Sequence, residues 1–150
     1  MIEIRALKPD DYEQLIQLLM EFFVYAGNDI LDDEETSRLW DKAIDEEKNY
    51  HMMCAIDHGE LVGIVSVTFG ESSYKAAPFA WCDDLYVKKA YRGHGIAKML
   101  MERICDFSAR VGCSNVLLGV GIDDEHAKEL YKSLGFIEMR NTLLTLRTEL

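Results

Sequence analysis

The spacing of apolar and polar positions predicts alternating strands and helices in the first half of the chain. Residues 2–6 alternate between apolar and polar side chains, as a half-buried strand does. An amphipathic helix follows to about Tyr25, and a second helix opens at the acidic run that starts with Asp32. Two runs rich in strand formers lie at residues 50–56 and 61–69, and the short polar segment between them favours a hairpin.

The second half of the chain continues this alternation. A strand is predicted at residues 80–87, and a helix runs from Ile96 to a glycine stop at Gly112. A further strand at residues 115–120 precedes a short helix that Gly135 closes. Two last strands complete the predicted order, at residues 136–139 and 142–146.

The element order predicts one α/β domain over residues 1–150, because the chain contains no repeat, low-complexity segment or linker. A hydrophobic share of 49% argues against disorder and supplies a substantial core. The net charge of -11 has the wrong sign for a protein that binds nucleic acid or an anionic membrane. The acidity suits a cationic small-molecule substrate, and it equally suits solubility alone.

The four cysteines are scattered through apolar or periodic stretches and form no CxxC pair, which is typical of reduced core residues. The histidines supply no ligand spacing either, so no metal site is predicted. No apolar run approaches the length of a membrane span, and no basic-apolar leader segment precedes the first strand. These features predict a cytoplasmic protein.

The most informative motif lies between the strand at residues 80–87 and the helix that starts at Ile96. Two glycines one residue apart, Gly93 and Gly95, let the backbone approach an anion closely. The helix that follows points its unpaired N–H groups and the positive end of its dipole at the same place. Because ligands of open α/β sheets bind at the carboxyl ends of strands, the motif predicts a site for a phosphorylated cofactor.

Three sequence blocks resemble the GCN5-related N-acetyltransferase (GNAT) superfamily. The segment Arg92-Gly93-His94-Gly95-Ile96-Ala97 is similar to the superfamily signature (Gln/Arg)-x-x-Gly-x-(Gly/Ala), and Asp84-Leu85-Tyr86-Val87 precedes it. Residues 127–136 resemble the closing A-x-x-L-Y-x-x-L-G-F block of the superfamily. The resemblance covers nearly the whole chain. It implies a single-domain GNAT fold, with a mixed, mostly antiparallel central sheet, a splayed parallel strand pair and flanking helices.

The same resemblance implies acetyl-CoA as co-substrate, bound where the strands at residues 80–87 and 115–120 splay apart. Backbone groups of the first strand would pair with the pantetheine amides, and the glycine turn would wrap the pyrophosphate. Asp124 stands where the superfamily often has asparagine, and it can still cap the last helix. The implied cofactor-binding residues are Leu85, Tyr86, Val87, Arg92, Gly93, His94, Gly95, Ile96, Ala97, Lys98 and Asp124.

No Cys/His or Ser/His arrangement indicates a covalent nucleophile, so direct attack by an amine in a ternary complex is expected. Tyr131 matches the tyrosine that many superfamily members place beside the CoA sulfur, and its hydroxyl would donate a proton or a hydrogen bond to the thiolate. Packing on the apolar face of the last helix is the alternative role of Tyr131. Asp83 is the candidate base, acting through water, and Asp84 is the candidate contact of the amine. Adjacent strand residues face opposite sides unless a bulge intervenes, so at most one carboxylate is expected to face the acceptor directly.

Residues 70–87 are similar to the spermidine/spermine N-acetyltransferase branch, which carries a Glu-Asp pair where this chain has Asp83 and Asp84. That likeness, with Tyr25 and the acidic start of the second helix on the acceptor side, implies a small cationic amine such as a polyamine or an aminoglycoside. A protein or peptide N-acetyltransferase is the alternative within catalysis. A catalytically silent acyl-CoA-binding module that regulates a partner is the alternative outside it. Exposed sheet edges allow a homodimer, although the sequence fixes no interface.

Overall fold

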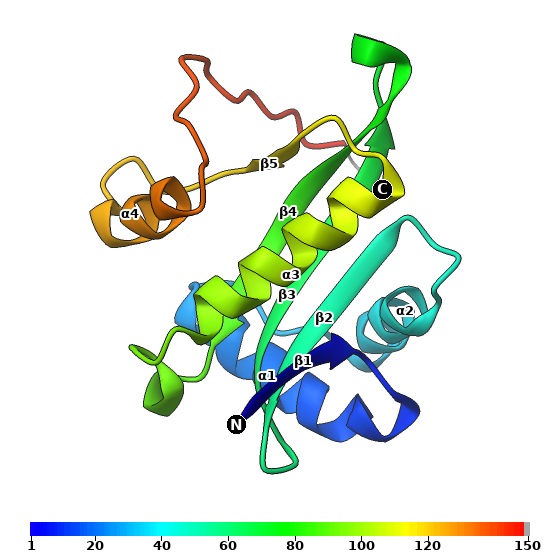
Figure 1. The fold of residues 1–150 in the computed structure, drawn as a ribbon. Helices are drawn as coiled ribbons and strands as arrows, with labels where there is room; N and C mark the ends of the chain where they lie inside the picture. The colour runs from blue at the N-terminus through cyan, green and yellow to red at the C-terminus, as the bar shows by residue number, and fades with distance from the viewer. Residues whose placement is uncertain (149–150) are drawn as a thin grey trace. The chain divides into compact units, whose positions relative to one another are not determined.

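The computed structural model describes residues 1–148 (Figure 1). The chain forms two compact units, Met1–Gly119 and Val120–Leu150. Within the described residues, the first unit contains the sheet and three α-helices, and the second contains one α-helix.

The first unit is built on a five-stranded sheet in the order β1-β2-β3-β4-β5. Neighbouring strands from β1 to β4 run antiparallel, whereas β4 and β5 run parallel. This confirms the predicted mixed, mostly antiparallel sheet, and the parallel pair is the one that a helix connects. The strands are β1 (Ile2–Ala6), β2 (Tyr50–Asp57), β3 (Glu60–Glu71), β4 (Pro78–Val87) and β5 (Val116–Leu118).

Three helices cover the two faces of this sheet. They are α1 (Tyr12–Tyr25), α2 (Asp33–Ile44) and α3 (Ile96–Val111). Helices α1 and α2 pack on one face, and α3 packs on the other, which is the front face in Figure 1. The Asp32 carboxylate caps α2 by accepting the Glu35 N–H at 2.8 Å, and left-handed Gly112 ends α3. The helix boundaries therefore follow the signals that the sequence carries.

Two apolar layers hold the sheet. On the α1 face, Leu15 and Leu18 pack with Ile64 of β3 and Tyr86 of β4 in one buried cluster. On the other face, α3 contributes four buried aliphatic or thioether side chains: Ile96, Leu100, Met101 and Ile104. Strand β3 is covered on both faces, which explains the near-continuous apolar run at residues 61–67.

A β-bulge interrupts the pairing of β3 with β4 at the two adjacent aspartates. Ser66 lies opposite Asp84 and Val67 lies opposite Cys82, so Asp83 is the extra residue on β4. Such a bulge re-aims the side chains around it, and consecutive residues can then face the same side of the sheet. The expectation that at most one aspartate faces the acceptor side applies to a regular strand and not to this one.

The second unit carries α4 (Glu125–Ser133). The Asp124 carboxylate accepts the Ala127 N–H at 3.1 Å and so provides the predicted N-terminal cap. The rings of Tyr131 and Phe136 lie 5.8 Å apart in an edge contact. Gly135 ends the segment with a left-handed φ of 99°.

The prediction of two C-terminal strands at residues 136–139 and 142–146 is wrong for the described chain, where neither segment pairs with a neighbour. Alternating apolar side chains are not sufficient for a strand, because its backbone groups must also find partners. Accordingly, Ile137 and Leu143 are exposed. The strand predicted at residues 115–120 is also shorter than expected and is limited to β5.

Candidate functional site

The glycine motif forms an open turn between β4 and α3. Gly93 and Gly95 adopt left-handed φ values of 79° and 80°, which residues with a side chain rarely adopt. A Cβ atom added to either glycine would meet no atom within 4 Å, so the space beside the turn is open to a ligand. The turn that the sequence predicts is therefore present, and Gly95 is the residue from which α3 starts.

The N-terminus of α3 has no side-chain cap in the described chain. The first-turn N–H groups of Ile96, Ala97 and Lys98 have no partner within the helix, and the helix dipole adds partial positive charge. Lys98 is exposed beside them, and the His94 ring turns back to lie 3.1 Å (Nδ1) from the Tyr91 carbonyl oxygen. These N–H donors and the lysine fit the pyrophosphate of acetyl-CoA, which they would hold by charge-assisted hydrogen bonds.

Glu60, the first residue of β3, holds the segment that leads into the glycine turn. One carboxylate oxygen accepts from the Tyr91 hydroxyl at 2.7 Å, and the other accepts from Lys88 Nζ at 3.1 Å. The hydrogen bond from Tyr91, followed by that from Lys88, lowers the pKa of Glu60. Lys88 is thus neutralised by a carboxylate of the β2–β3 hairpin, a contact that no local sequence pattern predicts.

Strand β4 extends beyond its pairing with β5. The two strands pair only at residues 80–82 of β4, and residues 83–87 pair with no described residue of β5. Backbone groups on that edge need other partners, which is the arrangement predicted to hold the pantetheine arm. Leu85 is half-buried, and Tyr86 and Val87 are buried, so their side chains pack inside and the backbone is what a ligand would meet.

Arg92 turns from the glycine turn toward the end of β4 and toward α1. Its Nε–H donates to the Val87 carbonyl oxygen at 2.9 Å. Its Cζ lies 4.7 Å from the centre of the Tyr25 ring and 5.3 Å from that of Tyr86, within the range of cation–π contacts. Tyr25, which is predicted on the acceptor side, therefore contacts Arg92 and Tyr86, which are both predicted to bind the cofactor.

Each of the two aspartates accepts a hydrogen bond from a hydroxyl group on β3. Thr68 Oγ1 lies 2.5 Å from Asp83 Oδ2, and Ser66 Oγ lies 3.0 Å from Asp84 Oδ2. Ser66 and Thr68 are two residues apart on one regular strand, so they share a face. Asp84 also shares its face of β4 with Tyr86, which packs against α1. Both carboxylates therefore reach the α1 face of the sheet.

The two aspartates differ in burial. Asp84 is half-buried, whereas Asp83 is exposed. Burial raises the pKa of Asp84, the hydrogen bond from Ser66 lowers it, and the charge of Asp83 raises it again. Burial also raises the pKa of Asp83, and the hydrogen bond from Thr68 opposes that shift. A raised pKa is what a carboxylate needs in order to take up a proton near neutral pH.

Three hydroxyl-bearing residues of this face, Tyr50, Ser66 and Thr68, are not selected by the sequence motifs. The signal that could have identified two of them is the alternation of Ser66 and Thr68 within an otherwise apolar run. Tyr50 opens β2 opposite Thr68. Burial, with the nearby charges of Asp84 and Asp83, raises the pKa of Tyr50, and an interaction with Ser66 opposes that shift.

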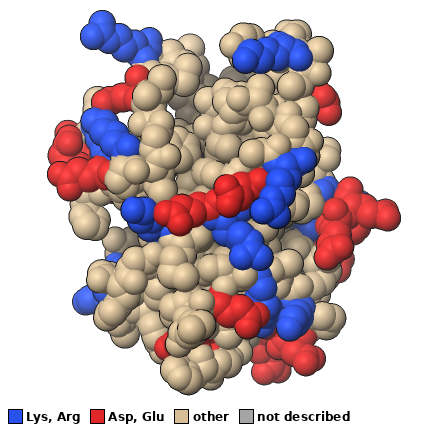
Figure 2. All heavy atoms as spheres, in the orientation of Figure 1, with Lys and Arg blue, Asp and Glu red and all other residues tan. Residues whose placement is uncertain are grey.

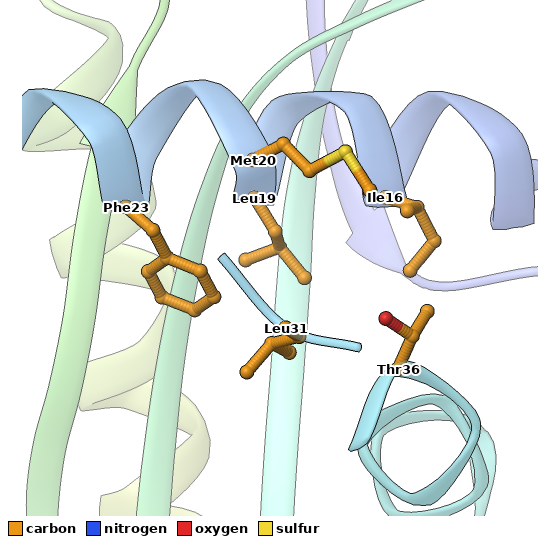
Figure 3. A pocket seen from close by; sticks show the side chains of 6 residues that line it. All are labelled: Ile16, Leu19, Met20, Phe23, Leu31 and Thr36. Carbon is orange, nitrogen blue, oxygen red and sulfur yellow. The ribbon is translucent and has the colours of Figure 1, made fainter. Parts of the chain in front are cut away.

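An apolar recess lies between α1 and the start of α2 (Figure 3). It is lined by Ile16, Leu19, Met20, Phe23, Leu31 and Thr36. None of these six side chains carries a charge, so the recess offers no partner for an ammonium group. The aspartates of β4 are therefore better candidates for contact with a cationic amine.

Tyr131 and Asp124, which the motifs predict beside the cofactor, belong to the second unit. The Asp124 carboxylate is engaged as the cap of α4, and Tyr131 is half-buried on that helix beside Phe136. Their contacts with acetyl-CoA remain predictions.

Figure 2 shows Lys and Arg side chains interspersed with Asp and Glu on the face in view, so the net charge of -11 is not gathered there into one acidic surface. The four cysteines are free thiols, and Cys54 and Cys82 are buried. Among residues 1–148, no three His, Cys, Asp or Glu side chains are grouped so as to hold a metal ion. No helix in the described chain is long and apolar enough to cross a membrane.

Comparison with known proteins assigns the chain to a family. Residues 12–136 match the Acetyltransferase (GNAT) family. Over 144 residues, which are 89% of this chain and 83% of the relative, the chain is 28% identical to thialysine N-epsilon-acetyltransferase of Bos taurus. A shorter alignment of 56 residues, 37% of this chain and 32% of the relative, is 41% identical to N-alpha-acetyltransferase 30 of Saccharomyces cerevisiae.

A solved structure supports the fold. The structure of AAC(6')-Iy in complex with the bisubstrate analog CoA-S-monomethyl-acetylneamine superposes with a TM-score of 0.80 at 15% identity, covering 99% of each chain. The chain therefore belongs to the Acetyltransferase (GNAT) family and has its α/β fold. Membership confirms the predicted class, that of acetyl-CoA-dependent N-acetyltransferases with acetyl-CoA as the co-substrate.

Proposed function

We propose that this chain transfers an acetyl group from acetyl-CoA to a small cationic primary amine, by direct attack of the amine in a ternary complex. The family supplies the donor chemistry. The observation that carries the acceptor half is the pair Asp83 and Asp84, both hydrogen-bonded to hydroxyls on the α1 face of the sheet.

On the donor side, the open glycine turn and the uncapped start of α3 supply N–H donors for the pyrophosphate. The stretch of β4 that pairs with no described residue of β5 would supply backbone groups for the pantetheine arm and for the thioester oxygen. Tyr131 would give a proton to the departing thiolate, and Asp124 would contribute at the cofactor through its place at the start of α4. Both roles come from motif position.

On the acceptor side, the carboxylates of β4 would attract an ammonium group. The Tyr25 ring, which packs against Tyr86 of the same strand, would guide it by a cation–π contact. The relatives are compatible with such an acceptor. The bovine relative is named for thialysine, and the solved structure holds an analog that joins CoA to acetylneamine. A polyamine or an aminoglycoside would satisfy the same charge pattern.

A protein or peptide N-acetyltransferase is the second candidate. The local similarity to the yeast N-alpha-acetyltransferase is what favours it. A catalytically silent acyl-CoA-binding module is the third, and the substitution of asparagine by Asp124 is the feature that favours it.

The deciding experiment measures thiol release from acetyl-CoA with a panel of polyamines, thialysine, aminoglycosides, neutral amines and peptides. We expect turnover with cationic small amines and little with neutral amines of the same length. Peptides as the best substrates would support the second candidate. Tight CoA binding by calorimetry without turnover of any amine would refute the enzymatic function.

Variants of the two aspartates distinguish the amine-binding site from the CoA-binding site. Asp83→Asn and Asp84→Asn should each raise the KM for the cationic amine while the affinity for CoA stays unchanged, because these carboxylates face the amine and not CoA. Asp106→Asn, an exposed aspartate of α3 on the opposite face, is the matched control.

A cytoplasmic location and a homodimer belong to the same proposal. Light scattering coupled to size-exclusion chromatography tests the dimer, and fractionation of the source cells tests the location.

A further inference from the structure

We propose that Ser66 is a positioning residue for proton removal from the acceptor amine. Its hydroxyl aims the Asp84 carboxylate as the proton acceptor, while Thr68 holds Asp83 as the ionised partner that attracts the ammonium group. The inference rests on the proposed function and deepens it. It exchanges the roles that the motifs suggest, in which Asp83 is the base and Asp84 the amine contact.

The bulge at Asp83 creates this arrangement. In a regular strand the two carboxylates would face opposite sides of the sheet, and one would point into the layer beneath α3. With the bulge, each reaches a different hydroxyl of the same β3 face, at 3.0 Å for Asp84 and 2.5 Å for Asp83. Two adjacent carboxylates with separate hydrogen-bond donors can take different protonation roles.

Burial decides which carboxylate takes which role. Asp84 is half-buried, accepts a hydrogen bond from the fully buried Ser66 and precedes the buried Tyr86 by two residues on β4. Asp83 is exposed, so water stabilises its charge. An incoming ammonium group meets Asp83 from solvent and is then next to the less hydrated Asp84, which gains more by taking up a proton.

Tyr50 of β2 lies beside this pair, opposite Thr68. Burial and the nearby charges of Asp84 and Asp83 raise the pKa of Tyr50, so a further negative charge on this face is disfavoured. Ser66 has one hydroxyl proton, and it donates that proton to Asp84. The Ser66 hydroxyl therefore sets the direction in which Asp84 presents its free oxygen.

The acetyl transfer balances in protons and electrons. The ammonium group gives one proton to the Asp84 carboxylate, and the nitrogen lone pair forms a bond to the acyl carbon of the thioester. The carbon–sulfur bond breaks, and its electron pair stays on sulfur. Sulfur takes a proton from the Tyr131 hydroxyl, and the second ammonium proton replaces it on Tyr131. The third proton remains on the amide nitrogen. Asp84 later returns its proton to water.

Charged and titratable groups of two strands act on the pKa values of this site. The charge of Asp83 acts on Asp84, and Asp84, Asp83 and Cys82 of β4 act on Tyr50 of β2. Further along β4, Glu21 and Tyr25 of α1 act on Tyr86. Burial and the charge of Asp83 both raise the pKa of Asp84, and the hydrogen bond from Ser66 lowers it, so Ser66 favours the deprotonated, proton-accepting form of Asp84.

The test is the pH profile of kcat/KM with one cationic amine. Ser66→Ala removes the hydrogen bond that favours the carboxylate form, so the acid limb should move up by about one pH unit, with recovery at higher pH. Ser66→Thr keeps a hydroxyl group and should restore the wild-type limb. Thr68→Val, the matched control on Asp83, should raise the KM and leave the limb in place.

A second measurement does not depend on turnover. Carboxyl ¹³C NMR titration should show the Asp84 resonance titrating at higher pH in Ser66→Ala than in the wild-type protein. An unmoved acid limb and an unmoved Asp84 resonance in Ser66→Ala would overturn the role of Ser66, even with an active enzyme. An enzyme inactive on every amine would instead refute the proposed function.

Discussion

The Arg92 guanidinium group is hydrogen-bonded to the Val87 carbonyl oxygen, with its Nε 2.9 Å from that oxygen. Val87 ends β4 on the stretch that has no pairing with the described residues of β5, so a side chain supplies the donor that a strand would otherwise supply. The same guanidinium lies against the Tyr25 and Tyr86 rings. One residue of the cofactor signature therefore fixes the end of β4 and touches the acceptor side.

Arg92→Lys tests this double contact. Lysine keeps the charge but loses the planar donor that bonds Val87 while stacking on the rings. We expect about five- to tenfold weaker CoA binding and a raised KM for the amine, because both sides lose their alignment. Calorimetry with CoA and steady-state kinetics measure the two effects. Arg110→Lys, at the exposed end of α3, is the control and should change neither.

Gly95→Ala tests whether the glycine turn binds CoA, apart from any effect of the substitution on stability. A left-handed φ of 80° costs a residue with a Cβ about 1 kcal/mol of stability. Gly27 has a φ of 76° and equally open surroundings, but it lies at the end of α1. Gly27→Ala should therefore show the same loss in urea unfolding. Only Gly95→Ala should also weaken CoA binding, and equal CoA affinities for the two variants would contradict the glycine turn as the pyrophosphate site.

The helices and the order of the strands along the chain as far as β5 could be predicted, because each element has its own local periodicity. Leu15, Leu18 and the acidic start of α2 carry their own signals of helix face and helix start. The glycine turn could also be predicted, because glycines such as Gly93 and Gly95 adopt left-handed φ values without steric cost.

Features that depend on pairing between distant segments could not be predicted. The bulge at Asp83 is set by the register of β4 against β3, and no residue type marks it. The contact of Arg92 with Tyr25 needs the end of α1 to meet the cofactor signature. The strand predicted at residues 142–146 failed for the same reason, because its pattern carried no information on a partner.

Tyr131→Phe tests the predicted acid. Removing the hydroxyl deletes the proton donor for the thiolate while it keeps the ring against Phe136. We expect kcat to fall by about 10²-fold, the lower end of general acid catalysis, with little change in CoA affinity. Tyr74→Phe, at an exposed position of the β3–β4 loop, is the control. An unchanged kcat would remove Tyr131 from the acid role and leave it as a packing residue of α4.

The ion pair between Arg5 and Asp11 gives a prediction for stability against pH. Arg5 Nη1 lies 2.7 Å from Asp11 Oδ2, and Asp11 is 5% exposed. The hydrogen bond from Arg5 outweighs burial and lowers the pKa of Asp11 below its ordinary 3.8. A carboxyl with a lowered pKa stabilises the fold above its ordinary pKa and loses this contribution as the pH falls through the folded value. The pair should therefore contribute fully at pH 7 and progressively less below about pH 4.

Asp11→Asn should cost about 2 to 4 kcal/mol at pH 7, since the partly buried Arg5 loses the nearer and more buried of its two carboxylate partners and keeps only Glu3. Urea unfolding at pH 7 and at pH 3 measures the difference between the variant and the wild-type protein, which should shrink at the lower pH. Glu34→Gln breaks the exposed Glu34–Arg38 pair of α2 and should cost less than about 0.5 kcal/mol at either pH. A difference for Asp11→Asn that is the same at both pH values would show that the charge of Asp11 does not carry its contribution to stability.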